Sequence, residues 1–263
     1  MKHIYFREMR LNAKNLIIWS LSVGILGMIC ILLYSSMQGD MEEMADAFSN
    51  MGMFSDAFGM STLSIATIGG FFATEVGTVH GLGSAMFASI LAITMLSKEE
   101  EGHSGEFLLT LPVSRGKVVI AKGLCILSDL VLFTVVCALF YILGFVLLGE
   151  DLPAKEFVTF MGMQLLMNAE LAGICYGISA LSWKNRMGLG LGLVLFFYIY
   201  DLMGRIVPDA KPYLYLGPYS YANASQIFAG EAMEGKGIAV ACLLLFCGFA
   251  FAFWEYRRRD LAA

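Results

Sequence analysis

The sequence predicts an all-α integral membrane protein with six transmembrane helices. Hydrophobic residues make up 58% of its 263 residues and charged residues only 15%, whereas a soluble domain averages about 45–50% and about 25%. The mean hydropathy of +0.72 agrees with this difference. The apolar residues also gather in six stretches, each with the roughly 20 helical residues needed to cross a bilayer core. Lipid rather than water is therefore expected to surround much of the chain.

The six predicted spans follow one another along a single transmembrane domain, residues 1–263. The third is longer than a bilayer requires, so we expect it to tilt or to project from the membrane. No period of 20–50 residues repeats, which argues against a solenoid. The spans are about Leu16–Met37, Gly77–Ser97, Val118–Gly149, Phe157–Trp183, Met187–Val207 and Gly237–Tyr256.

Lysine and arginine are distributed unevenly among the connecting segments. The N-terminal segment, the loop after the second span, the turn after the fourth and the C-terminal tail carry 13, and the other segments carry four. Because cytoplasmic segments are enriched in these residues, we expect a multi-pass protein of the cell membrane with both termini cytoplasmic. A formal net charge of −5 argues against a nucleic-acid partner, which requires a basic face.

The N-terminal segment, Lys2–Lys14, is predicted to form an amphipathic surface helix before the first span. Its cations recur at helical spacings of four, three and four, and Phe6, Met9 and Ala13 fall on another face. Such a helix lies on the inner leaflet with its cations toward lipid phosphates. The alternative is an ordinary cationic flank of the first span. The residues of the cationic face are His3, Arg7, Arg10 and Lys14.

Two long segments are expected on the external side. Gln38–Val76 is acidic, and its apolar second half, Ser61–Ala73, is too short to cross the membrane, so we expect it at the interface or partway into the bilayer. Pro208–Lys236 carries a group of tyrosines, which suit the level of the lipid headgroups. These are Tyr213, Tyr215, Tyr219 and Tyr221.

The loop between the second and third spans, Lys98–Arg115, combines a charged run with a short apolar segment. We predict a helix at Glu106–Leu111 that ends at Pro112, with Ser114 capping the third span. The apolar side chains of this short helix would be exposed unless a partner, or the rest of the protein, covers them. They are Phe107, Leu108 and Leu111.

This loop resembles the type-2 class of ATP-binding-cassette (ABC) exporter permeases. That class typically has Gly-Thr-x-Glu-x-Leu-Leu-x-x-Pro-Val-Ser-Arg after the second span. Here His103 replaces the usual Gly and Ser104 the usual Thr. The segments Pro218–Ala222 and Tyr256–Leu261 are also similar to those of the class. The matching loop residues are Glu106, Leu108, Leu109, Pro112, Val113, Ser114 and Arg115.

The resemblance implies a permease subunit that is not itself an enzyme. Its loop would be a coupling helix seated in a cleft of a cytoplasmic ABC ATPase, and two permeases and two ATPases would form the transporter. ATP and magnesium would bind to the ATPase, and this chain would carry no cofactor. Independently, no Lys is followed by Ser or Thr, as a phosphate-binding Walker loop requires. The coupling residues would be Glu106, Phe107, Leu108, Leu111, Pro112 and Arg115.

Three acidic residues fall within or near the predicted spans. Ionisable groups in a membrane usually face the bundle interior or a polar path, so Glu170 and Asp201 are candidates for the translocation path, with Asp129 nearer the cytoplasm. Asp201 and Arg205 can pair one helical turn apart. Three glycine pairs permit close helix packing, within one subunit or between two. They are Gly77/Gly81, Gly173/Gly177 and Gly188/Gly192.

Two other classes of function compete with this interpretation. An intramembrane protease is suggested by Gly102-His-Ser104-Gly, but that sequence lies in a charged loop rather than at the head of a span. A channel or carrier independent of ATP would leave the apolar loop without a purpose. We expect no metal site. A lone His80 is more typical of a packed or hydrogen-bonded group, and the methionines between Met37 and Met60 are more typical of an apolar helix face than of metal ligands. The six cysteines are expected to be small buried residues.

Overall fold

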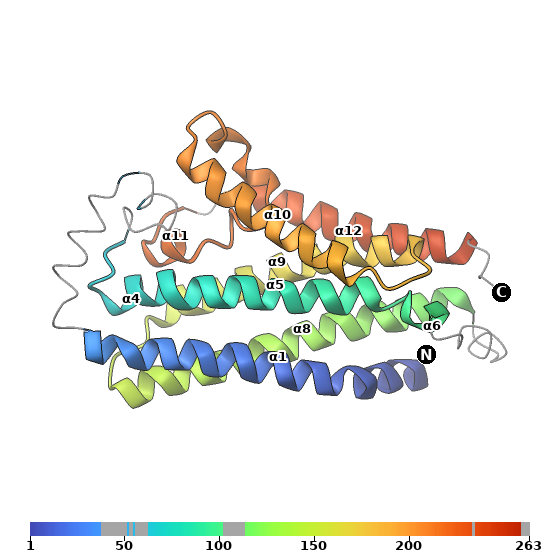
Figure 1. The fold of residues 1–263 in the computed structure, drawn as a ribbon, viewed down its shortest axis with the longest axis horizontal. Helices are drawn as coiled ribbons and strands as arrows, with labels where there is room; N and C mark the ends of the chain where they lie inside the picture. Colours follow the sequence, from blue (N-terminus) through green and yellow to red (C-terminus); the bar gives the residue numbers. More distant parts are fainter. Residues whose placement is uncertain (38–51, 53–54, 56–62, 102–113, 233–234, 259–263) are drawn as a thin grey trace.

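The computed structural model describes residues 1–37, 63–101, 114–232 and 235–258, together with residues 52 and 55 (Figure 1). These residues form helices and turns, and no strand occurs among them. Six of the helices are long and apolar enough to cross a membrane, so the predicted all-α architecture with six spans is confirmed. They are α1 (Lys2–Met37), the helix Ile68–Thr94, α8 (Arg115–Leu148), α9 (Ala154–Leu181), α10 (Met187–Ile206) and α12 (Gly235–Arg258).

The N-terminal segment does not form a separate surface helix, which corrects the prediction. Residues 2–14 are the first turns of α1, a single helix of 36 residues. The cations at Arg7, Arg10 and Lys14 are exposed as expected. On a neighbouring face, Ile4 is buried against Val118 and Ala121 of α8. This contact explains why the segment packs on the bundle instead of leaving it.

The second spanning helix begins at Ile68 rather than Gly77. It consists of α4 (Ile68–Phe71), a π-helical turn η1 (Phe72–Val76) and α5 (Gly77–Thr94), which follow one another without a gap. At its start, the Thr67 hydroxyl accepts a hydrogen bond of 3.1 Å from Gly70 N. The described part of the segment expected at the interface therefore begins this span. Phe72 is fully buried, and five aromatic rings surround it: Tyr141, Phe145, Phe157, Phe160 and Phe228.

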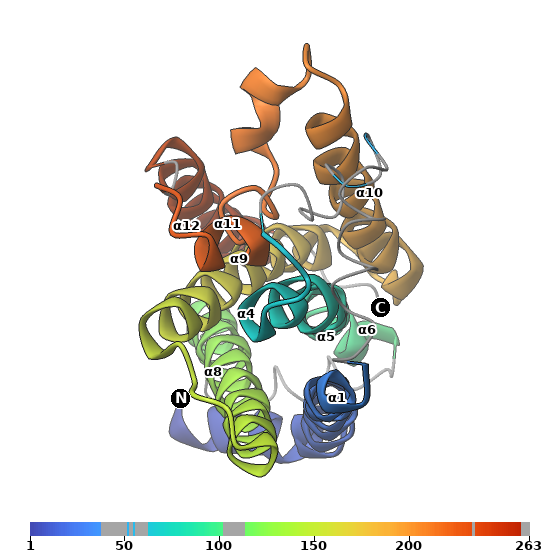
Figure 2. The ribbon, with the colours of Figure 1, turned by 90° about the vertical axis from the view of Figure 1, so that its left-hand side faces the viewer.

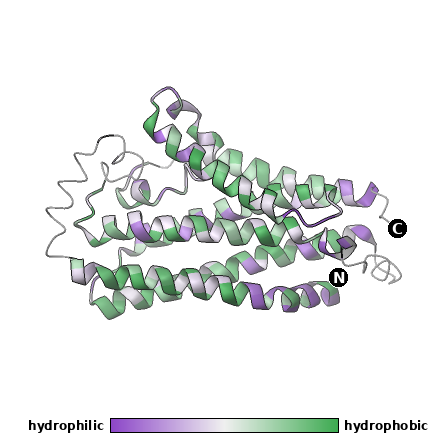
Figure 3. Cartoon of the chain, viewed as in Figure 1, coloured by the Kyte–Doolittle hydropathy of each residue, from purple (hydrophilic) through white to green (hydrophobic). Residues whose placement is uncertain are grey.

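The helix α5 lies at the centre of the bundle (Figure 2). It contacts α1 and α8 on one side and α9 and α10 on the other, while α12 packs along α9. Both termini lie at one end of the bundle, beside α6 (Lys98–Glu101) (Figure 1). The first turns of α1 and the last turns of α12 are hydrophilic at that end (Figure 3). The other end carries α4, η2 (Lys211–Leu216) and α11 (Ala224–Phe228).

The three glycine pairs have different surroundings. A Cβ atom added at Gly248 of α12 would lie 2.3 Å from the Gly173 carbonyl oxygen, and one at Gly177 would lie 3.4 Å from Gly248 O. Gly173 and Gly177 therefore permit close contact of α9 with α12 inside one subunit. Gly77 likewise packs against Ala224, whereas a Cβ at Gly188 or Gly192 would meet no described atom within 4 Å.

Candidate functional site

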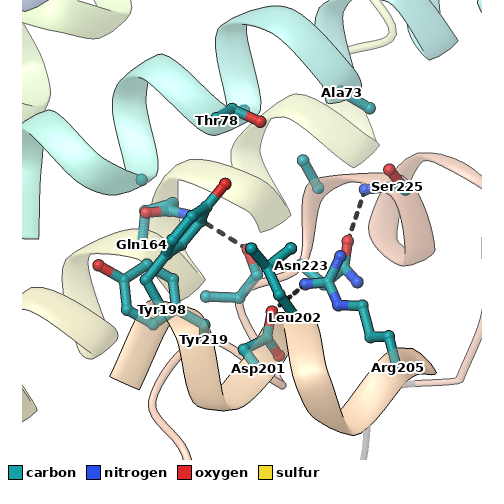
Figure 4. A pocket seen from close by; sticks show the side chains of 14 residues that line it. Ala73, Thr78, Gln164, Tyr198, Asp201, Leu202, Arg205, Tyr219, Asn223 and Ser225 are labelled. Carbon is teal, nitrogen blue, oxygen red and sulfur yellow. Dashed lines mark hydrogen bonds and ion pairs between the residues drawn. The ribbon is translucent and has the colours of Figure 1, made fainter. Parts of the chain in front are cut away.

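Asp201, a predicted translocation-path residue, lies in the wall of a small cavity at the end of the bundle opposite the termini (Figure 4). The cavity has a volume of about 50 Å³. Its wall comes from the start of the second spanning helix, the middle of α9, the end of α10 and the segment 219–225. Its polar residues are Thr78, Gln164, Tyr198, Asp201, Arg205, Tyr219, Asn223 and Ser225.

Asp201 is 2% exposed and forms an ion pair with Arg205. The four-residue spacing places both side chains on one face of α10, as the sequence predicted. Breaking a buried ion pair by removing one partner costs about 3–5 kcal/mol, because a buried charge loses its compensation. Because both partners lie on α10, the pair compensates the buried charge within that helix.

Three buried polar atoms around the cavity have no hydrogen-bond partner among the described residues. They are Asp201 Oδ1, Gln164 Oε1 and the Tyr219 hydroxyl. Leaving such a group buried and unsatisfied costs about 1–3 kcal/mol. Two of the three are pure acceptors, so a guest that donates hydrogen bonds would satisfy them. The volume of about 50 Å³ matches one or two water molecules or one small polar group, since a water occupies about 30 Å³ in the liquid.

The same ion pair also borders a second, larger cavity of about 230 Å³. Asp201, Arg205 and Asn223 line both cavities. The larger cavity further includes the exposed residues Lys211 and Glu231. The Asp201–Arg205 pair thus borders both cavities, and the larger one also has charged residues in its wall.

Glu170, the other predicted path residue, lines neither of these two cavities. It is 1% exposed, and the Tyr221 hydroxyl donates a hydrogen bond of 2.6 Å to its Oε2 atom. Tyr221 itself lines the larger cavity. Burial, together with the nearby Glu170 carboxylate, raises the pKa of Tyr221 well above its ordinary value. The phenol therefore stays protonated and remains a donor to Glu170.

The tyrosines of the segment 208–236 are not all at the surface, which corrects the expectation that they lie at headgroup level. Tyr213 is 59% exposed, but Tyr219 and Tyr221 are buried. The backbone also turns inward here, since Gln164 Nε2 donates a hydrogen bond of 2.9 Å to the Ala222 carbonyl. Sequence reasoning missed Gln164. Its polarity inside the fourth span, six residues before Glu170, was the available signal.

A second polar group lies at the opposite end of the bundle, where the termini are found. Lys98 Nζ lies 2.5 Å from Glu8 Oε2 and 3.5 Å from Asn12 Oδ1. Asn12 Nδ2 donates a hydrogen bond of 3.0 Å to Asp129 Oδ2. Glu8 and Asp129 are fully buried. This network, Glu8–Lys98–Asn12–Asp129, connects α1 and α8 to the first residue of α6.

The predicted coupling residues Glu106, Phe107, Leu108, Leu111 and Pro112 lie outside the described residues, as does the sequence Gly102–Gly105. The flanking residues Glu101 and Ser114 are described, at the end of the bundle with the termini. Arg115 is the first residue of α8. Ser114 stands at the N-cap with extended backbone, but its hydroxyl makes no capping hydrogen bond.

The surroundings of His80 and of the cysteines show whether each of these residues is packed in the protein interior. His80 is fully buried, and its Nδ1 atom lies 2.9 Å from the Tyr141 hydroxyl, so its packed and hydrogen-bonded interpretation is confirmed. Within the described ranges, no group of three or more His, Cys, Asp or Glu could hold a metal ion. Cys125, Cys137 and Cys175 are buried as expected. The expectation is wrong for Cys242 and Cys247, which are exposed on α12, and Cys30 is half-buried.

Comparison with known proteins extends over nearly the whole chain. A family model described as ABC-2 family transporter protein matches residues 3–261. The chain is also similar to a protein of Pseudomonas aeruginosa named "Probable ABC transporter permease protein NosY". The two are 27% identical over 205 residues, which is 66% of this chain and 74% of that relative.

Proposed function

The chain belongs to the ABC-2 family of transporter proteins and is a permease subunit, and we propose that it works in an ATP-driven exporter. The family membership confirms the resemblance seen in the loop Lys98–Arg115. It also implies association with ABC ATPase components in a membrane complex.

The match of residues 3–261 to the transporter family carries the proposal. The six apolar helices supply the membrane domain. ATP and magnesium belong to the partner ATPase, and this chain binds and guides the cargo without making or breaking a covalent bond. A second permease, identical or homologous, completes the path. Both termini are cytoplasmic, because the segments at their end hold 13 of the 17 Lys and Arg residues.

The ATPase docks on the loop Lys98–Arg115 through Phe107 and Leu111, which are four residues apart and would share one face of the predicted helix. The Glu8–Lys98–Asn12–Asp129 network supports this role, because it joins the start of the loop to α1 and α8. A displacement of the loop by the ATPase would reach two spanning helices through Lys98. The Lys98–Glu8 contact is an ion pair that compensates the buried Glu8 carboxylate.

The translocation path passes the polar residues at the other end of the bundle. Asp201 and its cavity offer unsatisfied acceptors to a hydrogen-bond-donating guest. Glu170 contributes through Tyr221 on the wall of the larger cavity. Ionisable groups inside a membrane usually mark a path for substrate or ions, which supports this assignment.

Purification from native membranes tests the proposal. The tagged full-length chain, extracted in a mild detergent, should bring with it a nucleotide-binding ATPase subunit and a second permease in equal numbers, identified by mass spectrometry of the intact complex. Vesicles of this complex should accumulate or release cargo only when ATP is present. A chain that purifies without an ATPase, and moves cargo without ATP, would support the channel or carrier alternative.

A further inference from the structure

An apolar groove runs between α8 and α12 near the end of the bundle that carries the termini. Its volume is about 410 Å³. Ile120 and Leu124 of α8 are 44% and 46% exposed along it, and Phe246 of α12 is 72% exposed. The other residues that line it are Val119, Gly123, Leu127, Phe249, Ala250 and Phe253.

Two glycines of α8 shape the groove. A Cβ atom added at Gly123 would lie 2.9 Å from the Phe249 ring, and one at Gly116 would lie 3.0 Å from the Phe253 ring. Both rings therefore lie directly on the backbone of α8. The absence of side chains at these two positions lets the rings pack closely on α8, and the rings then form part of the apolar wall of the groove.

The groove continues into a cationic cavity at the ends of the same two helices. This cavity has a volume of about 470 Å³ and shares Ile120 and Phe253 with the groove. Arg115, Lys117 and Arg257 line it, and the described residues of its wall include no Asp or Glu. The Arg257 guanidinium lies 5.2 Å from the centre of the Phe253 ring. Three positive groups thus stand where the apolar groove ends.

The length of the combined groove matches one leaflet of a bilayer. From Lys117 to Leu127 the helix α8 rises about 15 Å, at 1.5 Å per residue. Half of a hydrocarbon core of about 30 Å is also about 15 Å. Figure 1 shows that the start of α8 and the end of α12 lie together at the end of the bundle with both termini. With the cations at the depth of phospholipid phosphates, the groove would run along the depth of the acyl chains.

We propose that this groove is a binding site for an anionic phospholipid. One acyl chain lies along α8 and α12 against the Phe249 and Phe253 rings, and the phosphate is held by Lys117 and Arg257, beside Arg115. Charge complementarity favours this occupant over a second copy of the chain, because the described ends of α1 and α12, like the start of α8, are rich in cations. A lipid held here would join the first turn of α8, directly after the coupling loop, to the last turn of α12.

Native mass spectrometry of the intact transporter in nanodiscs tests the site. With equal amounts of phosphatidylglycerol and phosphatidylcholine, the wild-type complex should retain phosphatidylglycerol after transfer to detergent and release phosphatidylcholine. Lys117→Ala combined with Arg257→Ala should weaken retention about 25-fold, since each cation near a lipid surface contributes roughly fivefold. The matched control, Lys184→Ala with Arg186→Ala, removes two cations from the turn between α9 and α10, outside this groove, and should retain the lipid as the wild type does.

A second pair of variants tests the apolar part without changing charge. Leu124→Trp fills the groove from an exposed position and should release the lipid, whereas Leu139→Trp, at an exposed position of α8 outside the groove, should not. Equal retention of both lipids, or unchanged retention in the charge variant, would overturn the proposal. A change in the number of permeases per complex caused by Leu124→Trp would instead identify the groove as a contact between subunits, and would overturn it as well.

Discussion

Lys98 Nζ lies 2.5 Å from Glu8 Oε2, so the first residue of the loop between the second and third spans is ion-paired with the N-terminal part of α1. Glu8 is fully buried, while the Lys98 side chain is 30% exposed. A carboxylate in such a position requires a compensating charge. The relationship shows that residues 2–14 belong to the same packed unit as the start of the loop, and it provides the first of our predictions.

Removal of the Glu8 charge should destabilise the end of the bundle that carries the termini. We expect Glu8→Gln and Lys98→Met each to lower the free energy of unfolding by about 1–3 kcal/mol. The double variant should cost less than the sum, because both single variants remove the same ion pair. Thermal unfolding of the purified complex measures this, with the exposed Arg10→Gln on α1 as control. Strict additivity would mean that the two residues do not interact.

The Asp201–Arg205 pair provides a similar prediction at the other end. Asp201→Asn should destabilise by about 3–5 kcal/mol, since Arg205 keeps its charge in a largely buried position. Adding Arg205→Gln should restore part of that loss. The exposed Asp209→Asn, eight residues after Asp201, is the matched control. A double variant less stable than Asp201→Asn alone would contradict the role of the pair described here.

Glu170→Gln tests the polar path with little change of shape. The Gln side-chain oxygen can still accept the hydrogen bond from Tyr221, so the complex should assemble with normal thermal stability. Transport should fall or change its cargo preference, because the Gln side chain cannot ionise. Glu150→Gln, at an exposed position two residues after α8, should transport normally. Unaltered transport by Glu170→Gln would remove this residue from the path.

Labelling of introduced cysteines tests the orientation. In a variant without the six native cysteines, Ser49→Cys should react with an impermeant maleimide in intact cells, and Ser104→Cys only after the membrane is opened. The reason is the concentration of Lys and Arg at the end of the bundle with the termini. Reaction of Ser104→Cys in intact cells would place the termini outside.

The six spans could be predicted from the sequence because burial in lipid requires long apolar runs. Such runs are visible without any information on tertiary contacts. It was insufficient where a short apolar segment joined a longer one. Residues 68–76 extend the second span through a π-helical turn, although Glu75 interrupts their hydropathy. The packing of the first turns of α1 on the bundle could have been predicted, since the buried residues Ile4, Glu8 and Asn12 recur every four residues on one face. The exposed cations of the other face favoured a surface helix instead.

The polar site was less accessible from the sequence, for a physical reason. Glu170 and Asp201 were found because charges are rare in apolar helices. Their surroundings depend on contacts between distant parts of the chain, such as Tyr221 with Glu170, 51 residues apart, and Gln164 with the Ala222 carbonyl. No helical periodicity encodes such pairs. The segment 208–236 had the composition of a surface loop, although its residues 219–225 turn into the bundle.

The coupling role of the loop is the central claim, and a double truncation of its apolar face tests it most directly. Burial of one such side chain contributes about 1.5–3 kcal/mol, and about 1.4 kcal/mol is a tenfold change in affinity. Phe107→Ala with Leu111→Ala should therefore weaken ATPase docking by orders of magnitude while the six spans still insert.

The measurement is the number of ATPase subunits per permease in the complex purified from membranes that contain the variant in normal amount. We predict that the double variant loses the ATPase and stops transport, whereas Leu181→Ala, a truncation at an exposed position at the end of α9, keeps both. Retention of a full complement of ATPase, still stimulated by cargo, would show that the loop Lys98–Arg115 is not the coupling element.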